Sequence, residues 1–364
     1  MPAQGLGPLI APKPRKETMR HLTKTLAALA LLLAACGGDG EAGPPDSLTL
    51  IAHESFAEAV DEETFASFTD ATGIAVEVLA SDDAGTLVNQ AALSKDNPLA
   101  DVLFGVDDTF LSRAVDEGIF RAYESEHIGT VDPDLRHEAD LVTPIDYGDV
   151  CFNYDKEWFE SNDVALPDAL DDLTSDDFAG LVTVEHPATS SPGLAFLLAT
   201  IDVYGEDGWR DWWGSMRDAG VNVANDWNTA YYSDFTRYGG ETPMVMSYAS
   251  SPPAEVIFAD EPPEVAPTGV IEAGCYRQVE YAGILEGTDY PESAGELIDF
   301  LLSAEFQEDI PLTWFVFPAN QDAELPPEFV EHTTIPSSPT RLSAEYIAEN
   351  RDRWIDEWIE VMEG

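Results

Sequence analysis

Short apolar runs alternate with amphipathic stretches along residues 47–117. The apolar runs have the length and β-branched content of buried strands, and the stretches between them carry apolar residues at helical spacing. Ser55, for example, can cap a helix that buries Phe56, Val60, Phe65 and Phe68 and stops at Gly73. We expect strands at 47–52, 74–79 and 100–105, and helices at 55–72, 86–94 and 108–117. This order predicts an α/β fold with a mostly parallel sheet flanked by helices.

The second part of the chain repeats the pattern with a different sequence. We expect strands at 149–154, 181–185, 221–224, 244–248 and 276–282, and helices from Pro192 onward, at 296–302, 304–310 and 343–362. In the last helix Ile347, Trp354, Trp358 and Met362 are in register, so its tryptophans are expected to be core anchors. The length beyond residue 46 suits two domains.

The N-terminal segment has the pattern of an export signal. A basic stretch from Met19 precedes an apolar run, Leu26–Ala35, which is too short for a permanent membrane span. Small residues then precede Cys36, as in the bacterial lipobox, where the cysteine is lipidated. We therefore expect residues 1–18 to be a misassigned start, 19–36 a lipoprotein signal peptide and 37–46 a Gly/Pro-rich tether. An ordinary secretory signal with an incidental cysteine is the alternative.

Export would leave the folded body outside the cytoplasm. We expect it to be lipid-anchored at the outer face of the cytoplasmic membrane, or periplasmic, and to touch the membrane only through its lipid. No second apolar run of membrane-spanning length follows. Two cysteines remain after residue 36, Cys151 and Cys275, and an even pair in an oxidising compartment suggests one disulfide.

The chain is strongly acidic, with 17 Lys and Arg against 70 Asp and Glu and a formal charge of −53. Residues 1–36 hold five of the basic residues and one acidic residue, so the remainder carries −57. Nucleic acid is excluded as a partner because phosphate contacts require Lys and Arg. The charge is most typical of a solvated, salt-adapted surface, and it also permits steering of a cation into a cleft.

Candidate binding residues follow the predicted strands. Ligands of open α/β sheets bind beyond the carboxyl ends of the strands, near helix N-termini. In the first part these ends carry His53, Ser55, Asp83 and the pair Asp107–Asp108; in the second part they carry Ser190, Ser191, Gly193, Trp227, Tyr231 and Tyr248, with Trp314 and Phe315 in a later apolar loop. Loop aromatics beside carboxylates suit a flat, delocalised cation. The Ser190–Ser191–Pro192 helix start could hold a phosphate, or it could be only a cap.

Enzyme and metal signatures are missing from the sequence. There is no G-x-S-x-G, H-E-x-x-H, Walker or G-x-G-x-x-G motif, and the six histidines lack metal-ligand spacing. We therefore expect a binding protein that needs no metal or other cofactor and performs no catalysis. The alternative class, an extracellular hydrolase, would need an acid pair or a nucleophile–base set that the sequence does not reveal.

With these segments in view, the chain resembles the thiamine-binding subunits of bacterial ABC transporters, in the type 2 periplasmic-binding-protein superfamily. The matching stretches occur in order along the chain: Glu54–Phe56, ADVLFGVDD at 100–108, PIDYGDVCFNYDKEWF at 144–159, HPATSSPGLAFLLA at 186–199, DWNTAYY at 226–232, MSYASSP at 246–252, AEFQEDIP at 304–311 and RDRWIDEWIEVM at 351–362. The resemblance implies a two-lobe clamp, with lobe 1 at 47–145 and 280–364 and lobe 2 at 146–279. Cys151 and Cys275 would lie on the two strands that join the lobes.

The resemblance also implies the roles of individual residues. Asp83 would face the thiazolium or the aminopyrimidine, Ser190 and its neighbours would receive the hydroxyethyl or phosphate end, and Trp227 and Tyr248 would wall the ligand. His53 and Phe315 replace a tyrosine and a tryptophan of the family. The full set of expected ligand-binding residues is His53, Ser55, Asp83, Asp146, Tyr147, Ser190, Ser191, Gly193, Trp227, Tyr231, Tyr248, Trp314 and Phe315.

The implied function is capture of thiamine or its phosphates by a monomer that serves an ABC transporter permease and its ATPase. Hinge closure would accompany binding. Another cationic solute such as a polyamine, or ferric iron, remains the alternative ligand.

Overall fold

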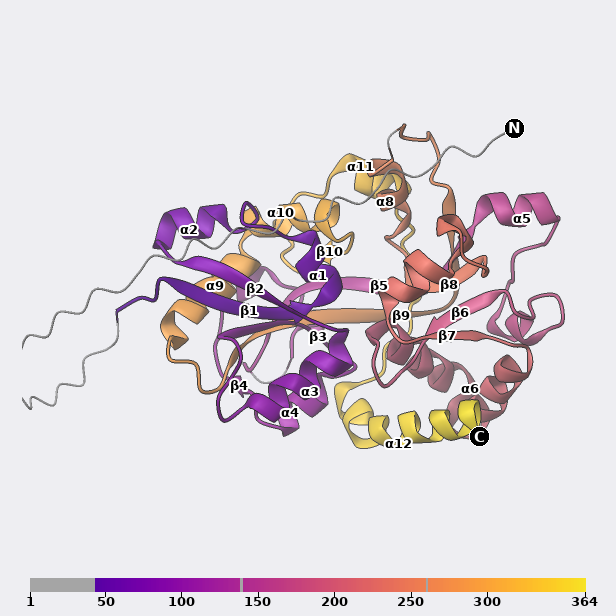
Figure 1. Cartoon of the computed structure of the whole chain (residues 1–364), viewed down its shortest axis with the longest axis horizontal. Coiled ribbons are helices and arrows are strands. Elements are labelled where there is room, and N and C mark those ends of the chain that lie inside the picture. The colour runs from indigo at the N-terminus through magenta and orange to yellow at the C-terminus, as the bar shows by residue number, and fades with distance from the viewer. Residues whose placement is uncertain (1–42, 138–139, 260) are drawn as a thin grey trace, which may run out of the picture. The chain divides into compact units, whose positions relative to one another are not determined.

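One mixed sheet organises the part of the chain that the structure describes. The structure is a computed structural model that describes residues 43–137, 140–259 and 261–364. Within these residues, ten strands form the sheet (Figure 1). The strands are β1 Ser47–His53, β2 Ala75–Ser81, β3 Val102–Asp107, β4 Phe120–Arg121, β5 Thr143–Asp155, β6 Val182–Glu185, β7 Asn222–Ala224, β8 Met244–Tyr248, β9 Thr268–Leu285 and β10 Phe317–Pro318.

The two ends of the sheet are parallel and the middle is antiparallel. The strand order is β2-β1-β3-β9-β5-β8-β6-β7, with β10 paired to β5 and β4 paired to β9. Strands β2, β1 and β3 run parallel at one end, and β8, β6 and β7 run parallel at the other. The long strands β5 and β9 pair antiparallel between them and join the two groups. This arrangement confirms the predicted α/β fold: two parallel groups connected by two crossing strands.

Helices cover the sheet, and most lie where the sequence predicts them. The α-helices are α1 Glu54–Ala59, α2 Ala66–Thr72, α3 Ala84–Ser94, α4 Leu111–Asp116, α5 Lys156–Asn162, α6 Ser191–Asp218, α7 Trp227–Thr229, α8 Pro252–Ile257, α9 Pro291–Leu302, α10 Ala304–Thr313, α11 Pro327–His332 and α12 Ala344–Glu363. Short 3₁₀ turns occur at 128–130, 133–135, 170–174 and 236–238, and a π-helical turn follows α7 at 230–234.

The first predicted helix is two helices in the structure. His53, not Ser55, is the N-cap of α1, because its ring nitrogen accepts the Phe56 N–H. Extended backbone at Val60 ends α1, and α2 begins only at Ala66. Both helices still bury the expected phenylalanines, and α2 ends at Gly73 in the left-handed conformation that glycine favours. The spacing of apolar residues therefore indicated correctly which side chains are buried, but it did not indicate the break between α1 and α2.

Helix α6 begins as predicted and then changes direction. Ser190 is its N-cap and Pro192 lies in its first turn. Gly205 has φ 68° and ψ 173°, which interrupts the helix and sets Glu206 at the start of its second segment. That segment buries Trp209, Trp212 and Trp213. Because only glycine adopts this backbone region without strain, Gly205 determines where the segment points.

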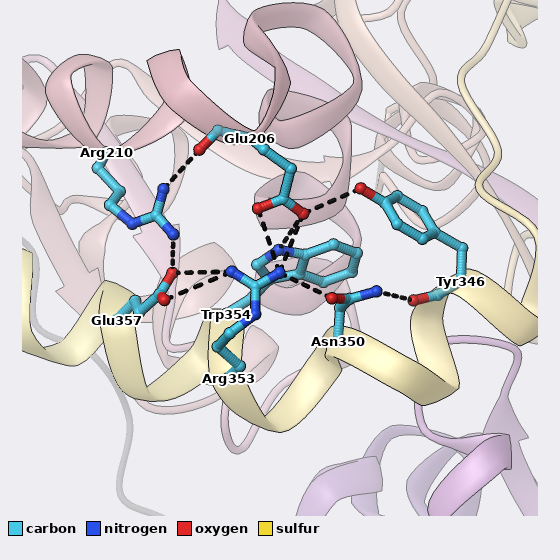
Figure 2. A network of polar contacts seen from close by, with 7 residues as sticks. All are labelled: Glu206, Arg210, Tyr346, Asn350, Arg353, Trp354 and Glu357. Atoms are coloured by element: carbon cyan, nitrogen blue, oxygen red, sulfur yellow. Dashed lines mark hydrogen bonds and ion pairs between the residues drawn. The ribbon is translucent and has the colours of Figure 1, made fainter.

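The last helix, α12, docks on α6 through buried tryptophans and a polar network. Trp354 and Trp358 are fully buried, and Trp358 packs edge-on against Trp213 of α6. Figure 2 shows the polar network around Trp354, in which Glu206 of α6 accepts hydrogen bonds from side chains of α12. Helix α12 also reaches α4, where the Arg351 guanidinium lies 4.5 Å from the centre of the Phe110 ring. It thus contacts elements that the predicted boundaries assign to different lobes.

Three predictions concern residues that the structure does not describe. The start at 1–18, the signal at 19–36 with Cys36, and residues 37–42 of the tether lie outside the described residues. Among the described residues, no helix combines the length and apolarity that a membrane span requires. In the same part of the chain, Cys151 of β5 and Cys275 of β9 form a disulfide with their Cα atoms 4.5 Å apart.

Candidate functional site

A large cleft opens where the carboxyl ends of both parallel strand groups face one another. Its volume is about 730 Å³, within the range of small-molecule sites. Strands β1 and β8 end at its wall with His53 and Tyr248. Nine of the predicted residues line it: His53, Ser55, Asp83, Ser191, Trp227, Tyr231, Tyr248, Trp314 and Phe315. The rule that ligands bind beyond the carboxyl ends of strands therefore located the cleft.

His53 forms one charged corner of the cleft. Its Nδ1 accepts the Phe56 N–H at 3.2 Å and lies 2.8 Å from Ser55 Oγ, so Nε2 carries the proton. Nε2 lies 3.5 Å from Glu280 Oε1. Burial lowers the pKa of His53, but Glu280 and then two aspartates raise it more, and the net shift is upward. The pair therefore presents a proton donor and a carboxylate side by side.

Asp83 offers an acceptor without a partner. It is the N-cap of α3, and its Oδ1 accepts the Ala84 N–H at 2.8 Å. Its Oδ2 is buried and has no hydrogen-bond partner. Burial raises the pKa of the Asp83 carboxyl, while the Ala84 N–H, then His53 and the nearby Ser190 hydroxyl oppose that shift. A buried acceptor without a partner is costly, so this oxygen suits a ligand that brings a donor or a positive charge.

Aromatic rings form the opposite wall. Trp227 and Tyr231 are stacked with ring centroids 5.0 Å apart, and Trp227 Nε1 donates to Ser247 Oγ at 2.9 Å. Tyr231 and Tyr238 both donate to Glu255 Oε1, at 3.0 and 2.8 Å. These bonds fix the rings as flat surfaces of the cleft. Rings of this kind attract a delocalised cation through their electron-rich faces.

Trp314 closes the cleft near the crossing strands. It is the C-cap of α10, and its Nε1 donates to Asp146 Oδ2 at 3.2 Å. Asp146 is fully buried beneath it and does not line the cleft. Burial and then the nearby Glu280 raise the pKa of Asp146 well above its ordinary value, which favours the protonated form. Asp146 thus holds the Trp314 indole in position from beneath the cleft surface.

Three further predicted residues lie away from the cleft surface. Tyr147 stacks on Phe317 and lines a separate cavity of about 540 Å³. Its side chain faces away because neighbours along a strand point to opposite faces. Ser190 is fully buried, and its hydroxyl lies near the Asp83 carboxyl without forming a hydrogen bond of good geometry. Gly193 allows close packing, since a Cβ there would lie 2.5 Å from the Glu185 carbonyl oxygen.

The cleft also contains residues that the sequence analysis missed. Glu280 pairs in register with Asp146 across β9 and β5. Glu58, Glu255, Arg237, Tyr238 and Phe258 also line the cleft. Glu280 stands in an alternating strand, QVEYAGIL, and a carboxylate inside a buried strand was the signal that could have identified it. Glu58 and Glu255 belong to a chain so rich in acidic residues that no local pattern distinguishes them.

No cluster of three or more His, Cys, Asp or Glu side chains in the described residues has a metal-binding arrangement. The cleft instead combines carboxylates, one imidazole and several aromatic rings. Such a set can bind a flat cation by charge, stacking and hydrogen bonds.

Comparison with known proteins gives consistent matches. Residues 97–350 match the family described as bacterial extracellular solute-binding protein. The thiamine-binding periplasmic protein of Escherichia coli K12 is 30% identical over 283 residues, covering 78% of this chain and 83% of the relative. That of Salmonella typhimurium LT2 is 29% identical over 329 residues, covering 90% of this chain and 96% of the relative.

Solved structures agree on the fold. A periplasmic thiamin binding protein superposes with a TM-score of 0.77 at 27% identity, covering 87% of this chain and 96% of that chain. A ferric binding protein from Campylobacter jejuni superposes with a TM-score of 0.70 at 19% identity, covering 86% of this chain and 99% of that chain. The second likeness concerns the fold alone.

Proposed function

Because this chain belongs to the family of bacterial extracellular solute-binding proteins, we propose that it captures thiamine in the cleft and delivers it to an ABC transporter permease. Relatives that match over most of this chain carry the name of thiamine-binding periplasmic proteins. Binding without chemical turnover is the activity that such names describe.

One observation in the cleft supports this ligand above all. Flat aromatic surfaces at Trp227, Tyr231 and Trp314 face carboxylates at Asp83 and Glu280, and Asp83 Oδ2 has no partner of its own. Thiamine has a positively charged thiazolium and an aminopyrimidine with hydrogen-bond donors. Stacking and cation–π contacts contribute about 0.5–2 kcal/mol each, so several together give tight binding.

Closure of two lobes around the ligand is part of the proposal. Lobe 1 would comprise residues 47–145 and 280–364, and lobe 2 would comprise residues 146–279. The two lobes would move relative to each other about β5 and β9. Contacts between the two parts are consistent with a closed form, since Gly85 N–H donates to the Thr189 carbonyl at 3.1 Å. Ligand binding would shift the population toward this form.

Anchoring would hold the protein near its permease. We propose export by the segment at 19–36 and lipid attachment at Cys36, so that a monomer stays at the outer face of the cytoplasmic membrane. The disulfide between Cys151 and Cys275 suits that oxidising location.

Calorimetric titration of the purified chain with thiamine tests the proposal. We expect saturable binding with one site and quenching of tryptophan fluorescence, because Trp227 and Trp314 line the cleft. Spermidine and ferric citrate serve as the competing ligands. Heat and quenching with either of these, and none with thiamine, would overturn the assignment and leave the fold unaffected.

A further inference from the structure

Two carboxyl groups face each other in the long strands that join the two parallel groups. Asp146 of β5 pairs in register with Glu280 of β9, so both side chains project from the same face of the sheet. Asp146 is fully buried, and Glu280 is 8% exposed and lines the cleft. Like charges directly opposite each other in neighbouring strands repel, and burial strengthens that repulsion. Two ionised carboxylates are therefore unfavourable at this position.

The contacts of this pair do not neutralise it. Trp314 Nε1 donates to Asp146 Oδ2, whereas Asp146 Oδ1 is buried without a hydrogen-bond partner. Glu280 Oε1 has His53 Nε2 and the neutral Gln278 amide nitrogen as neighbours, each at 3.5 Å. Among the described residues, no lysine or arginine forms an ion pair with either carboxyl.

The pair therefore holds one proton before a ligand enters. Burial and then Glu280 raise the pKa of Asp146 well above its ordinary value. A shared proton removes the repulsion between the two groups and lets one carboxyl donate to the other. Asp146 is the better site for this proton, because Glu280 is closer to solvent and faces His53 Nε2.

The other titratable groups nearby respond to a cation in the same direction. Asp83 and Asp107 are further carboxyls whose charges act on His53. Burial and then Glu280 raise the pKa of Tyr248, at the end of β8, well above its ordinary value. The positive charge of a ligand lowers the pKa of each of these acids and disfavours protonation of His53. Every titratable group around the pair thus favours loss of a proton when a cation enters.

We propose that the cleft exchanges a proton for its cationic ligand, because the Asp146–Glu280 pair gives up its shared proton as the cation enters. The inference rests on the proposed function, since it concerns how the same site regulates the capture of thiamine. The proton passes to solvent, and no bond of the ligand changes. The quaternary thiazolium nitrogen has no proton to lose, so the ligand keeps this charge while the site becomes more negative. Affinity for the cation therefore rises with pH, and acid favours its release.

Calorimetry of the unaltered protein in two buffers tests the exchange. Titration with thiamine at pH 7 in PIPES and in ACES, which differ in their enthalpy of ionisation, gives the number of protons released per ligand. We expect about 0.3–1 proton, and an affinity that rises between pH 6 and 8 by up to about tenfold per unit, the limit for one proton. The matched ligand is 3-deazathiamine, in which a neutral ring replaces the thiazolium. It should release few protons and bind with little change across this range.

The outcomes separate the two proposals. If thiamine does not bind at any pH between 6 and 8, the proposed function is wrong. If thiamine binds with release of fewer than about 0.1 proton and with an affinity that does not vary with pH, the proton exchange is wrong. If 3-deazathiamine releases as many protons as thiamine, closure of the protein rather than the charge of the ligand expels the proton, which also overturns the inference.

Substitutions assign the proton to the carboxyl pair. Asp146→Asn keeps the size of the side chain and can still accept from Trp314 Nε1, but it cannot ionise. Proton release should therefore fall by at least about half, and the rise of affinity with pH should flatten. Asp149→Asn is the control, because Asp149 is also buried on β5 but pairs with Arg277 and does not line the cleft. It should release as many protons as the unaltered protein.

Glu280→Gln tests the same pair from the other strand. It removes the group that shares the proton, so it should also lose most of the proton release, and it decides the question if Asp146→Asn fails to fold. Proton release equal to that of the unaltered protein in either folded variant would exclude the pair as its source.

Discussion

Carboxylates have cationic partners where α12 docks on α6, and almost none in the cleft. At the helix contact Glu206 accepts two bonds from Arg353, at 3.0 and 3.1 Å, and further bonds from Tyr346 and Trp354 (Figure 2). Glu357 pairs with both Arg210 and Arg353. In the cleft Asp83 Oδ2 has no partner in hydrogen-bond geometry, and Glu280 Oε1 has His53 Nε2 and the neutral Gln278 amide as its neighbours, each at 3.5 Å.

The difference follows from how few basic residues the chain has. Beyond residue 36 there are 12 lysines and arginines, and four of them, Arg210, Arg217, Arg351 and Arg353, lie on α6 and α12. Among the described residues that line the cleft, Arg237 is the only lysine or arginine. Paired carboxylates hold the C-terminal helix in place, whereas unpaired ones remain available to a cationic ligand. Carboxylates thus stabilise the contact between α6 and α12, and in the cleft they provide negative charge for a cationic ligand.

The largest effect on stability is expected at the helix contact. Trp354→Ala should lower the free energy of unfolding by about 3–5 kcal/mol, because it empties a fully buried site and removes the donor to Glu206. Urea denaturation measures this. Trp354→Phe, which keeps an apolar ring, should lower the free energy of unfolding by less than half as much. A tenfold loss of thiamine affinity in the folded variant would show that the two regions are not separate.

Exchanging one carboxylate in each region sharpens the comparison. Asp83→Asn should weaken thiamine binding by about 10- to 100-fold without loss of stability, since asparagine still caps α3 but carries no charge. Glu206→Gln should leave affinity unchanged and lower stability by about 1 kcal/mol. Calorimetry and urea denaturation of both variants report the two quantities. A loss of stability in Asp83→Asn together with a loss of thiamine affinity in Glu206→Gln would contradict the assignment of binding to the cleft and of stability to the helix contact.

The smallest expected effect is on pH dependence. Burial raises the folded pKa of Asp107 to about 7 and that of Asp108 to about 6, so the folded state binds protons more readily than the unfolded chain. Stability should therefore rise by about 1–2 kcal/mol as pH falls from 8 to about 5. Paired Glu206 acts in the opposite direction, because its lowered pKa removes stability only at more acidic pH.

Calorimetric melting between pH 8 and pH 4 measures this dependence. The melting temperature should pass through a maximum near pH 5. Asp107→Asn should flatten the part of the curve between pH 8 and 6. A melting temperature that falls steadily from pH 8 downward would contradict the raised pKa of these buried carboxyls.

The sequence was most informative where local physics decides the structure. The N-cap of α6, the stop of α2 at Gly73 and the buried face of α12 all follow from residue type and spacing. The start of α1 and its break from α2 did not. The His53 ring, which accepts the Phe56 N–H, sets the start of α1, and extended backbone at Val60 ends it. Similarly, the spacing of apolar residues did not indicate that α6 is interrupted at Gly205. It therefore did not show that Glu206 begins the second segment of that helix.

By itself the sequence determined the α/β class, the order of strands and helices, the acidic character and most aromatic residues of the cleft. These depend on composition and short-range spacing. Only the tertiary structure decided which carboxylates have partners, because pairing joins residues far apart in the chain, such as Glu206 with Arg353 and Asp107 with Ser191. It also decided that Glu280 lines the cleft and that Tyr147 does not. Strand register and helix docking set those positions, and neither can be read from one segment alone.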